Sequence, residues 1–216
     1  FKHYRLSDLL EDILKENKNL YRLRLSSIEI REIDHHFLKL LKQYPNIANH
    51  LHMPLQSGSP SVLKRMGRKY NISDFIDKVN LIRQARPDIS ITTDVIVGFP
   101  GETEEEFLET YNFIKLIKFS ELHVFPFSAR ERTKAYSMPD QVSAKIKEQR
   151  VHKLLELSKE LESEYKKKFI GQELEAILEE RNKQTGLLSG FTSNYLKLSI
   201  DLPDDYIGKV CKIKVR

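Results

Sequence analysis

Four short polar stretches, each directly after an apolar segment, hold the residue types best suited to ligand chemistry in this chain. They are SSIE at 26–29, QSGS at 56–59, GFPGET at 98–103 and FSARERT at 127–133. Gln56 offers both a hydrogen-bond donor and an acceptor, which suits a ribose or an amino-acid group. Gly98 and Gly101 let backbone atoms approach a flat ligand where a side chain would block access. These types predict a pocket for a small polar ligand.

Charged residues near the same stretches add to this set. Arg68, on a basic helix after QSGS, suits a carboxylate or a phosphate. Glu29 and Glu102 could accept from hydroxyl or ammonium groups, but Glu102 also fits the acidic first turn that a helix dipole favours. Likewise, GFPGE alone is an ordinary turn, and Ser57 or Ser59 could simply cap the next helix.

The elements that position these stretches alternate between helix and strand. Apolar spacing predicts helices over 3–17, 34–44, 59–67, 73–85 and 104–119, and strands over 20–30, 50–56, 88–97 and 121–128. Short connections in this order favour parallel strands with right-handed crossovers, whose carboxyl ends lie at one edge. Because ligands gather at such edges, four polar strand ends together predict a pocket rim.

The pattern changes after this α/β region. A long charged helix is predicted over 143–169, followed by short alternating strands over 170–216 that suggest a small antiparallel barrel. The expected domains are therefore 1–142, a connecting helix at 143–169, and 170–216. Cations and aromatic rings mix in the last part, which suits phosphate contact and base stacking, although alternating lysines also fit a solvent face. The residues in question are Arg181, Lys183, Phe191, Tyr195 and Lys197, with Lys209, Lys212, Lys214 and Arg216 as further cations.

Composition narrows the class of protein. The 216 residues carry a formal charge of +5, and 40% are hydrophobic, so the chain permits a nucleic-acid partner and predicts a folded core. One cysteine, Cys211, excludes an internal disulfide and fits a cytoplasmic location. No apolar run is long enough to cross a membrane. His35, His36, His50 and His52 show no metal-ligand spacing, so we expect no metal site.

Several motifs together resemble the methylthiotransferase branch of the radical S-adenosylmethionine enzymes. They are RLSSIE, LHMPLQSGSPSVLKRMGRKY, TTDVIVGFPGETEEEF, HVFPFSARERTKAYSMPDQV and GLLSGFTSNYLKL with GKVCKIKV, which span Leu9 to Arg216. SSIE and HVFPFSAR favour the branch acting on threonylcarbamoyladenosine of tRNA over those acting on isopentenyladenosine or ribosomal protein S12. One departure is Arg132, where the family more often has glycine.

This resemblance implies a fold, cofactors and partners. The fold is a partial radical S-adenosylmethionine (β/α) barrel, strands three to six of six, followed by an RNA-binding β-barrel of the TRAM type. The cofactors are S-adenosylmethionine and two 4Fe–4S clusters, whose cysteine ligands this chain lacks. Its partners would be tRNA and the missing N-terminal half of the same protein, since the chain opens with Phe1 inside a predicted helix.

The resemblance also assigns site residues. RNA contact falls to the basic and aromatic residues named above, while no catalytic residue is assigned. The S-adenosylmethionine site is expected to comprise Ser26, Glu29, Gln56, Ser57, Arg68, Ile96, Gly98, Gly101, Glu102, Phe125 and Phe127.

Two functions follow. The first is the C-terminal part of an enzyme that adds a methylthio group to threonylcarbamoyladenosine next to the anticodon, inactive when alone. The alternative is a non-catalytic RNA-binding protein with a degenerate barrel, or a methylthiotransferase of the isopentenyladenosine or ribosomal protein S12 branch. In either case an unpaired strand at 20–26 would leave an edge open to self-association.

Overall fold

A computed structural model describes residues 4–215, so the expectations for Phe1 and Arg216 lie outside the described residues. The first part holds a three-stranded sheet in the order β1-β2-β3, formed by β1 (His50–His52), β2 (Ser90–Val97) and β3 (Glu121–Pro126). Both pairings are parallel, with Leu51 opposite Ile91 and Asp94 opposite His123. The predicted mixed α/β fold with a parallel sheet is thereby confirmed.

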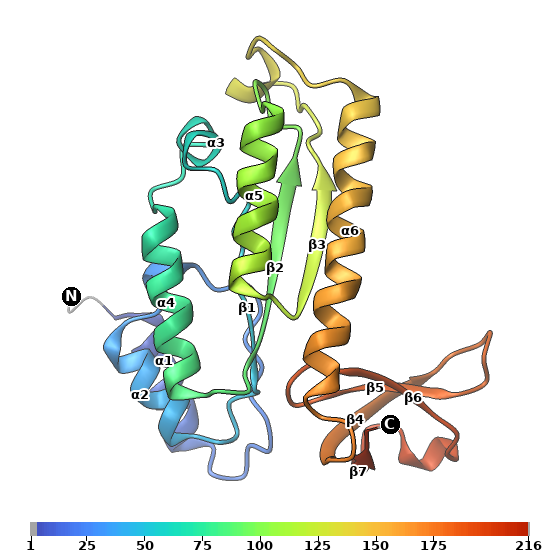
Figure 1. The fold of residues 1–216 in the computed structure, drawn as a ribbon. Coiled ribbons are helices and arrows are strands. Elements are labelled where there is room, and N and C mark those ends of the chain that lie inside the picture. Colours follow the sequence, from blue (N-terminus) through green and yellow to red (C-terminus); the bar gives the residue numbers. More distant parts are fainter. Residues whose placement is uncertain (1–3, 216) are drawn as a thin grey trace.

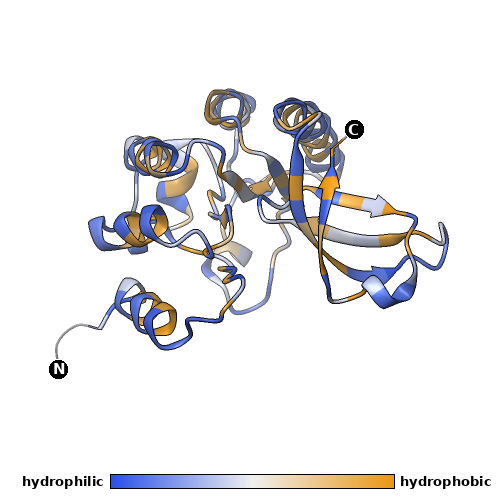
Figure 2. Ribbon diagram, turned by 90° about the horizontal axis from the view of Figure 1, so that it is seen from below, coloured by the Kyte–Doolittle hydropathy of each residue, from blue (hydrophilic) through white to orange (hydrophobic). Residues whose placement is uncertain are grey.

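Helices pack around this sheet. They are α1 (Leu6–Glu16), α2 (His35–Gln43), α3 (Pro60–Arg65), α4 (Ile72–Ala85) and α5 (Glu104–Ile117), with a 3₁₀ turn at Ile30–Glu32. Capping explains where α4 and α5 begin, because Asn71 and Thr103 each accept from the backbone amide three residues on. Figure 2 shows helices with one hydrophobic and one hydrophilic side, as expected for helices that cover a core.

The core lies between the sheet and these helices. The inward face of β2 carries Val95 and Val97, both fully buried, while Phe75, Phe113 and Phe119 pack edge to face around Phe75. Alternate residues of β2, among them Asp94 and Ile96, project to the opposite, half-exposed face. This face, away from α4 and α5, is the one free to hold ligands.

The strand predicted over 20–30 does not form, and this prediction is corrected. This segment forms only two isolated parallel bridges, Leu23 with Ile47 and Ser27 with His52. Its neighbour β1 is three residues long, and Pro54, two residues after its end, has no amide hydrogen to extend a ladder. The segment therefore runs beside β1 in the expected direction without becoming a strand.

A long helix joins the sheet to the C-terminal part. Helix α6 (Ala144–Lys167) runs the length of β3 in Figure 1, and Leu154, Leu157 and Leu161 bury its inner stripe. A second sheet in the order β6-β5-β4-β7 lies at its foot, near the amino ends of β2 and β3. Its strands are β4 (Glu173–Arg181), β5 (Leu188–Thr192), β6 (Lys197–Ile200) and β7 (Val210–Lys214), all antiparallel, with a 3₁₀ turn at Asp204–Tyr206.

Two further features bear on function. Arg132 has a φ of +67°, the left-handed region that favours glycine, which explains why a glycine suits this position. Among the described helices, none combines the length and the apolar character that crossing a membrane requires.

Candidate functional site

The polar strand ends meet at one edge of the parallel sheet. Gln56 bridges to Val95, Ile96 pairs with Phe125, and the Phe127 amide donates to the Val97 carbonyl at 2.8 Å. QSGS, GFPGE and the end of β3 thus share the carboxyl edge, the upper end of the sheet in Figure 1. Such an edge is where open α/β sheets bind ligands.

Gln56, Ile96 and Phe125 each have free surface at this edge. Phe125 is 51% exposed, and Ile96, its register partner on β2, is half-buried. Gln56 is half-buried with a φ of +66°, an unusual backbone conformation for a residue other than glycine. An exposed aromatic ring beside an aliphatic side chain and an amide fits a flat ring with polar substituents.

The Ser57 side chain points elsewhere, which revises the expectation for it. It is 0% exposed, and its hydroxyl lies 3.0 Å from that of Thr110 on α5. Gly58 explains this close packing, because a Cβ there would lie 2.8 Å from the Phe113 Cβ. Ser59 begins α3 without a side-chain cap, and its amide donates to Ser57. The QSGS turn is therefore tied to α5 through its serine.

Glu102 is also taken up by internal contacts. Its carboxylate accepts from the Gly98 amide and from Arg150 of α6, both at 2.6 Å, and its side chain is 1% exposed. Burial raises the pKa of Glu102, although the Gly98 amide and Arg150 oppose this shift. The role expected for this carboxylate, binding a ligand hydroxyl or ammonium, is thereby replaced by fastening the GFPGE turn to α6.

A lysine that sequence reasoning missed covers the glycine of that turn. Gly98 has a φ of +73°, and a Cβ there would meet the Lys147 Cγ at 2.4 Å. The Lys147 ammonium donates to the Phe127 carbonyl at 2.9 Å and lies 5.3 Å from the Phe127 ring. Nearby, the Gly101 amide donates to the Asp140 carbonyl. Lys147 therefore holds two strand ends together, and a lysine on a charged helix carries no sequence signal for this.

Glu29 and Arg68 line one shallow pocket of about 280 Å³. Tyr70 also borders it, and its hydroxyl donates at 2.6 Å to the Leu55 carbonyl, next to Gln56. Burial raises the pKa of Tyr70 to about 12, so this hydroxyl stays a donor. Ser26 is exposed on the irregular segment before β1. Tyr70 therefore lies between this pocket, which Glu29 and Arg68 line, and the carboxyl edge of the sheet.

In the C-terminal sheet, the Arg181 side chain is bound by nearby residues of the same part of the chain. Its guanidinium contacts Asp204 at 2.6 Å and the Leu202 carbonyl at 2.7 Å, and it also donates to the Gly186 carbonyl. The sequence predicts an RNA-contacting cation here, but the structure shows an arginine that ties β4 to the loop before β7. Lys183 is exposed, as an RNA-contacting cation needs to be.

Tyr195 and Phe191 stack at the junction between the two sheets. The Tyr195 ring lies 4.2 Å from the His50 ring and 4.6 Å from the Phe191 ring, with Arg24 over it at 4.8 Å. Burial lowers the pKa of His50 to about 3, so this ring stays neutral. The Tyr195 ring, expected to stack on an RNA base, is thus stacked on His50 of β1 and on Phe191, which revises that expectation. Arg24 also donates to the Thr192 carbonyl, so part of the 20–26 edge is covered.

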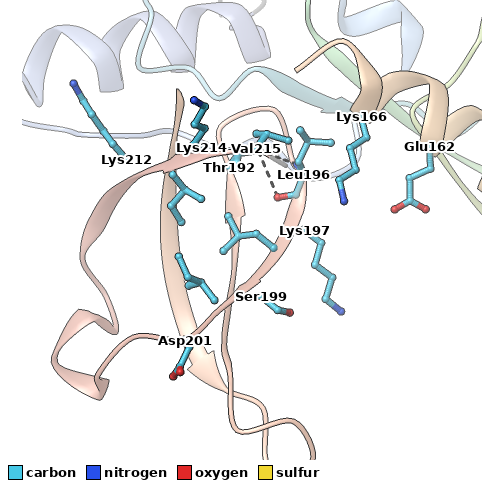
Figure 3. Close-up of a pocket in the computed structure, with 13 residues that line it drawn as sticks. Glu162, Lys166, Thr192, Leu196, Lys197, Ser199, Asp201, Lys212, Lys214 and Val215 are labelled. Atoms are coloured by element: carbon cyan, nitrogen blue, oxygen red, sulfur yellow. Dashed lines mark hydrogen bonds between the residues drawn. The ribbon is translucent and has the colours of Figure 1, made fainter. Parts of the chain in front are cut away.

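A lysine-lined groove of about 830 Å³ lies between β6, β7 and the end of α6 (Figure 3). Lys197, Lys212 and Lys214 come from the strands, and Lys166 comes from the helix. Glu162 and Asp201 are the acidic residues of this lining, so cations exceed anions four to two. Lys166 was missed because it precedes the strands in the chain. Four lysines thus border this groove, although Lys212 and Lys214 also lie in register with Glu175 and Glu173 of β4.

Comparison with known proteins places this architecture. Residues 3–114 match the family model described as the radical SAM superfamily. The chain belongs to the radical SAM superfamily. This superfamily uses S-adenosylmethionine and a 4Fe–4S cluster, and clusters are held by several cysteine thiolates. This radical SAM chain has only Cys211, which lies on β7, so its residues do not fit a cluster.

Full-length relatives resemble almost all of this radical SAM chain. The threonylcarbamoyladenosine tRNA methylthiotransferase MtaB of Bacillus subtilis is 47% identical over 99% of the chain and 48% of its own length. The protein of the same name from Thermotoga maritima is 42% identical over 89% of the chain and 44% of its own. A tRNA-2-methylthio-N(6)-dimethylallyladenosine synthase of Bacillus velezensis reaches 35% over 98%, and 42% of its own. The chain thus spans about half the length of the curated relatives it matches.

Among solved structures, coproporphyrinogen III oxidase (HemN) from Escherichia coli is similar in fold. It matches with a TM-score of 0.59 and 18% identity, over 74% of this chain and 38% of its own. At that identity the likeness supports the radical SAM fold alone.

Proposed function

We propose that this chain is the C-terminal part of a tRNA methylthiotransferase acting on threonylcarbamoyladenosine. The observation that carries the proposal is the 47% identity to the Bacillus subtilis MtaB protein across 99% of the chain. Identity to the dimethylallyladenosine synthase is lower, at 35% over a similar span. This difference favours the threonylcarbamoyladenosine substrate over the dimethylallyladenosine one.

In this proposal the carboxyl edge of the parallel sheet holds S-adenosylmethionine. Phe125 and Ile96 would contact the adenine ring, and Gln56 would hydrogen-bond the ribose or the methionyl group. Glu29 and Arg68 border the neighbouring pocket and would bind polar groups of the ligand. When bound, S-adenosylmethionine supplies the radical chemistry of the superfamily. The residues of this chain bind and orient it, while Glu102, Arg150 and Lys147 keep the turn that faces it in place.

The second part of the proposal assigns tRNA contact to the C-terminal sheet, as a domain of the TRAM type. The supporting observation is the groove lined by Lys166, Lys197, Lys212 and Lys214. Exposed lysines around one groove would bind phosphates by charge and release counterions, so the contact would tolerate many sequences.

A chimera tests the catalytic part. Residues 1–216 replace the matching segment of Bacillus subtilis MtaB, and the tRNA nucleosides of an mtaB-deficient strain are analysed by mass spectrometry. We expect the methylthio group to return to threonylcarbamoyladenosine. We expect Gln56→Ala to lower its yield and Lys159→Ala, on the exposed side of α6, to leave it unchanged. A folded chimera that binds tRNA but restores no methylthio group would support the non-catalytic RNA-binding alternative.

Salt dependence tests the RNA part on the chain itself. Removing one phosphate-binding lysine should lower the slope of log affinity against log salt by about 0.7–0.9. The triple variant Lys197→Ala, Lys212→Ala and Lys214→Ala should therefore lower the slope by about 2–3. Lys115→Ala, Lys145→Ala and Lys159→Ala, which change three exposed lysines of α5 and α6, form the charge-matched control. Equal slopes for both triple variants would refute the groove as the tRNA surface.

A further inference from the structure

Two imidazoles and one carboxylate meet on the open face of the parallel sheet, below the carboxyl edge. His52 Nε2 lies 3.2 Å from one Asp94 carboxylate oxygen, and His123 Nδ1 lies 3.2 Å from the other. The two imidazole rings stack at 5.2 Å, and the three groups place one ligand atom each within 4.8 Å of one another. No residue assigned to S-adenosylmethionine or to tRNA belongs to this cluster.

The sheet register explains why these three residues meet. Asp94 on β2 pairs with His123 on β3, and His52 on β1 pairs with Thr92, two residues before Asp94. Residues two apart in a strand project to the same face, so one face receives all three side chains. Because each comes from a different strand, their separations along the chain are 42 and 29 residues and match no short metal motif.

The donor set matches what transition metals prefer. Two histidine nitrogens and a carboxylate oxygen bind zinc at about 2.0–2.2 Å, which puts neighbouring ligand atoms about 3.3–3.5 Å apart in a tetrahedron. The two nitrogen–oxygen separations of 3.2 Å are close to this value. The His123 side chain is 42% exposed, which leaves its ring room to turn toward His52.

A second layer of contacts holds the His52 ring. Its other nitrogen, Nδ1, lies 2.9 Å from the Thr92 hydroxyl, which also lies 2.9 Å from His50 Nε2. Hydrogen bonds of this kind fix the ring orientation of metal-binding histidines and tune their basicity. Glu121 lies beyond His123, at 3.9 Å from its Nε2.

We propose that His52, Asp94 and His123 form a binding site for a divalent transition metal of the zinc type. Three protein ligands leave at least one coordination position open, and catalytic rather than structural metal sites have this property. The open position would face the space in front of the sheet, where it can take an oxygen donor of a bound molecule. The proposal does not rest on the function proposed above.

Hydrogen bonds alone are the competing explanation, since each imidazole can donate to Asp94 without any metal. The 216-residue chain distinguishes the two when it is titrated with Zn²⁺ against a chromophoric chelator. We expect one Zn²⁺ per chain, and Co²⁺ in its place should give the visible absorption of a site with fewer than six ligands. Absence of stoichiometric binding would overturn the proposal.

Variants locate the site. Asp94→Asn keeps size and hydrogen bonding but removes the charged ligand, so affinity should fall by about 100-fold or more, and His123→Gln should act alike. Thr92→Val, which removes only the supporting hydroxyl, should cost about 10–100-fold. The matched control is His36→Gln, since His36 faces Asp8 at 3.4 Å and Glu11 at 3.3 Å on the helical surface.

Circular dichroism of each variant separates the removal of a ligand from a failure to fold. If Asp94→Asn and His123→Gln fold and still bind as the unmodified chain does, the metal lies elsewhere and the proposal fails. If only His36→Gln abolishes binding, the surface cluster is the site, and the proposal again fails.

Discussion

Arg150 offers a sharp test of what fastens α6 to the sheet. Its guanidinium, 6% exposed, donates to the Glu102 carboxylate at 2.6 Å and to the Glu102 carbonyl at 3.1 Å, while Glu104 lies at 3.3 Å. Arg150→Met removes the charge and keeps most of the volume. The Glu102 carboxylate, 1% exposed, then stays buried with the Gly98 amide as its main partner.

The expected destabilisation follows from breaking a buried ion pair on one side. Removing one partner of such a pair costs about 3–5 kcal/mol, because the remaining charge is left without compensation. For a chain of this size each kcal/mol lowers the melting temperature by about 2–4 °C. Arg150→Met should therefore lower it by about 6–20 °C at about pH 7. Glu102→Gln should cost less, because Arg150 retains Glu104 and a carbonyl and the amide oxygen can still accept from Gly98.

Calorimetry and urea unfolding of both single variants and the double variant measure the coupling. The double variant should be more stable than Arg150→Met alone, since no buried charge is left unpaired. Lys159→Met on the exposed side of the same helix should change stability by about 0.5 kcal/mol or less. A destabilisation below about 1 kcal/mol for Arg150→Met, or a double variant less stable than both singles, would refute the reasoning.

Three other predictions concern the fold. His50 is buried with its pKa lowered to about 3, so it is neutral when folded, and stability should fall as the pH drops from about 6.5 toward 3; His50→Phe should flatten this part of a plot of urea midpoint against pH. Arg132→Gly should raise the melting temperature by about 1–4 °C, because φ is +67° there; a decrease would show that the Arg132 side chain is needed. Gly58→Ala should cost about 1–3 kcal/mol in urea unfolding, because the added carbon meets α5 at 2.8 Å, whereas the exposed Lys64→Ala should cost almost nothing.

Periodicity was sufficient to predict most of the elements. Helices α4 to α6 and strands β2 and β3 lie where apolar spacing places them, since each buries one continuous face. The strand prediction for 20–30 was wrong because a strand needs a neighbour of similar length, and β1 has only three residues. A pattern that alternates cannot reveal how long its partner strand is.

The position of a site residue was predictable where strand order alone determines it. It was not predictable where side chains distant in sequence determine its contacts. The common edge of Gln56, Gly98 and Phe125 follows from strand order alone. The partners of Glu102, Arg181 and Tyr195 come from α6, the loop before β7 and β1, and no local pattern specifies such contacts. The cluster of His52, Asp94 and His123 was not predicted either, because its residues come from three strands that are distant in sequence. The HLH sequence of β1 was the only local indication of it.

The Thr92 hydroxyl connects the cluster of His52, Asp94 and His123 to His50, at the junction between the two sheets. It has one proton to donate. It contacts His52 Nδ1 and His50 Nε2, and it can donate to only one of them. If His52 Nε2 donates to Asp94, then Nδ1 accepts from Thr92, and Thr92 accepts from His50 Nε2. A metal on His52 Nε2 would reverse this order: Nδ1 would donate to Thr92, the hydroxyl would donate to His50 Nε2, and neutral His50 would carry its proton on Nδ1, a buried atom without a partner among the described residues. Metal binding would therefore switch the tautomer of the His50 ring, which stacks on Tyr195, and nitrogen NMR of His50 would report it.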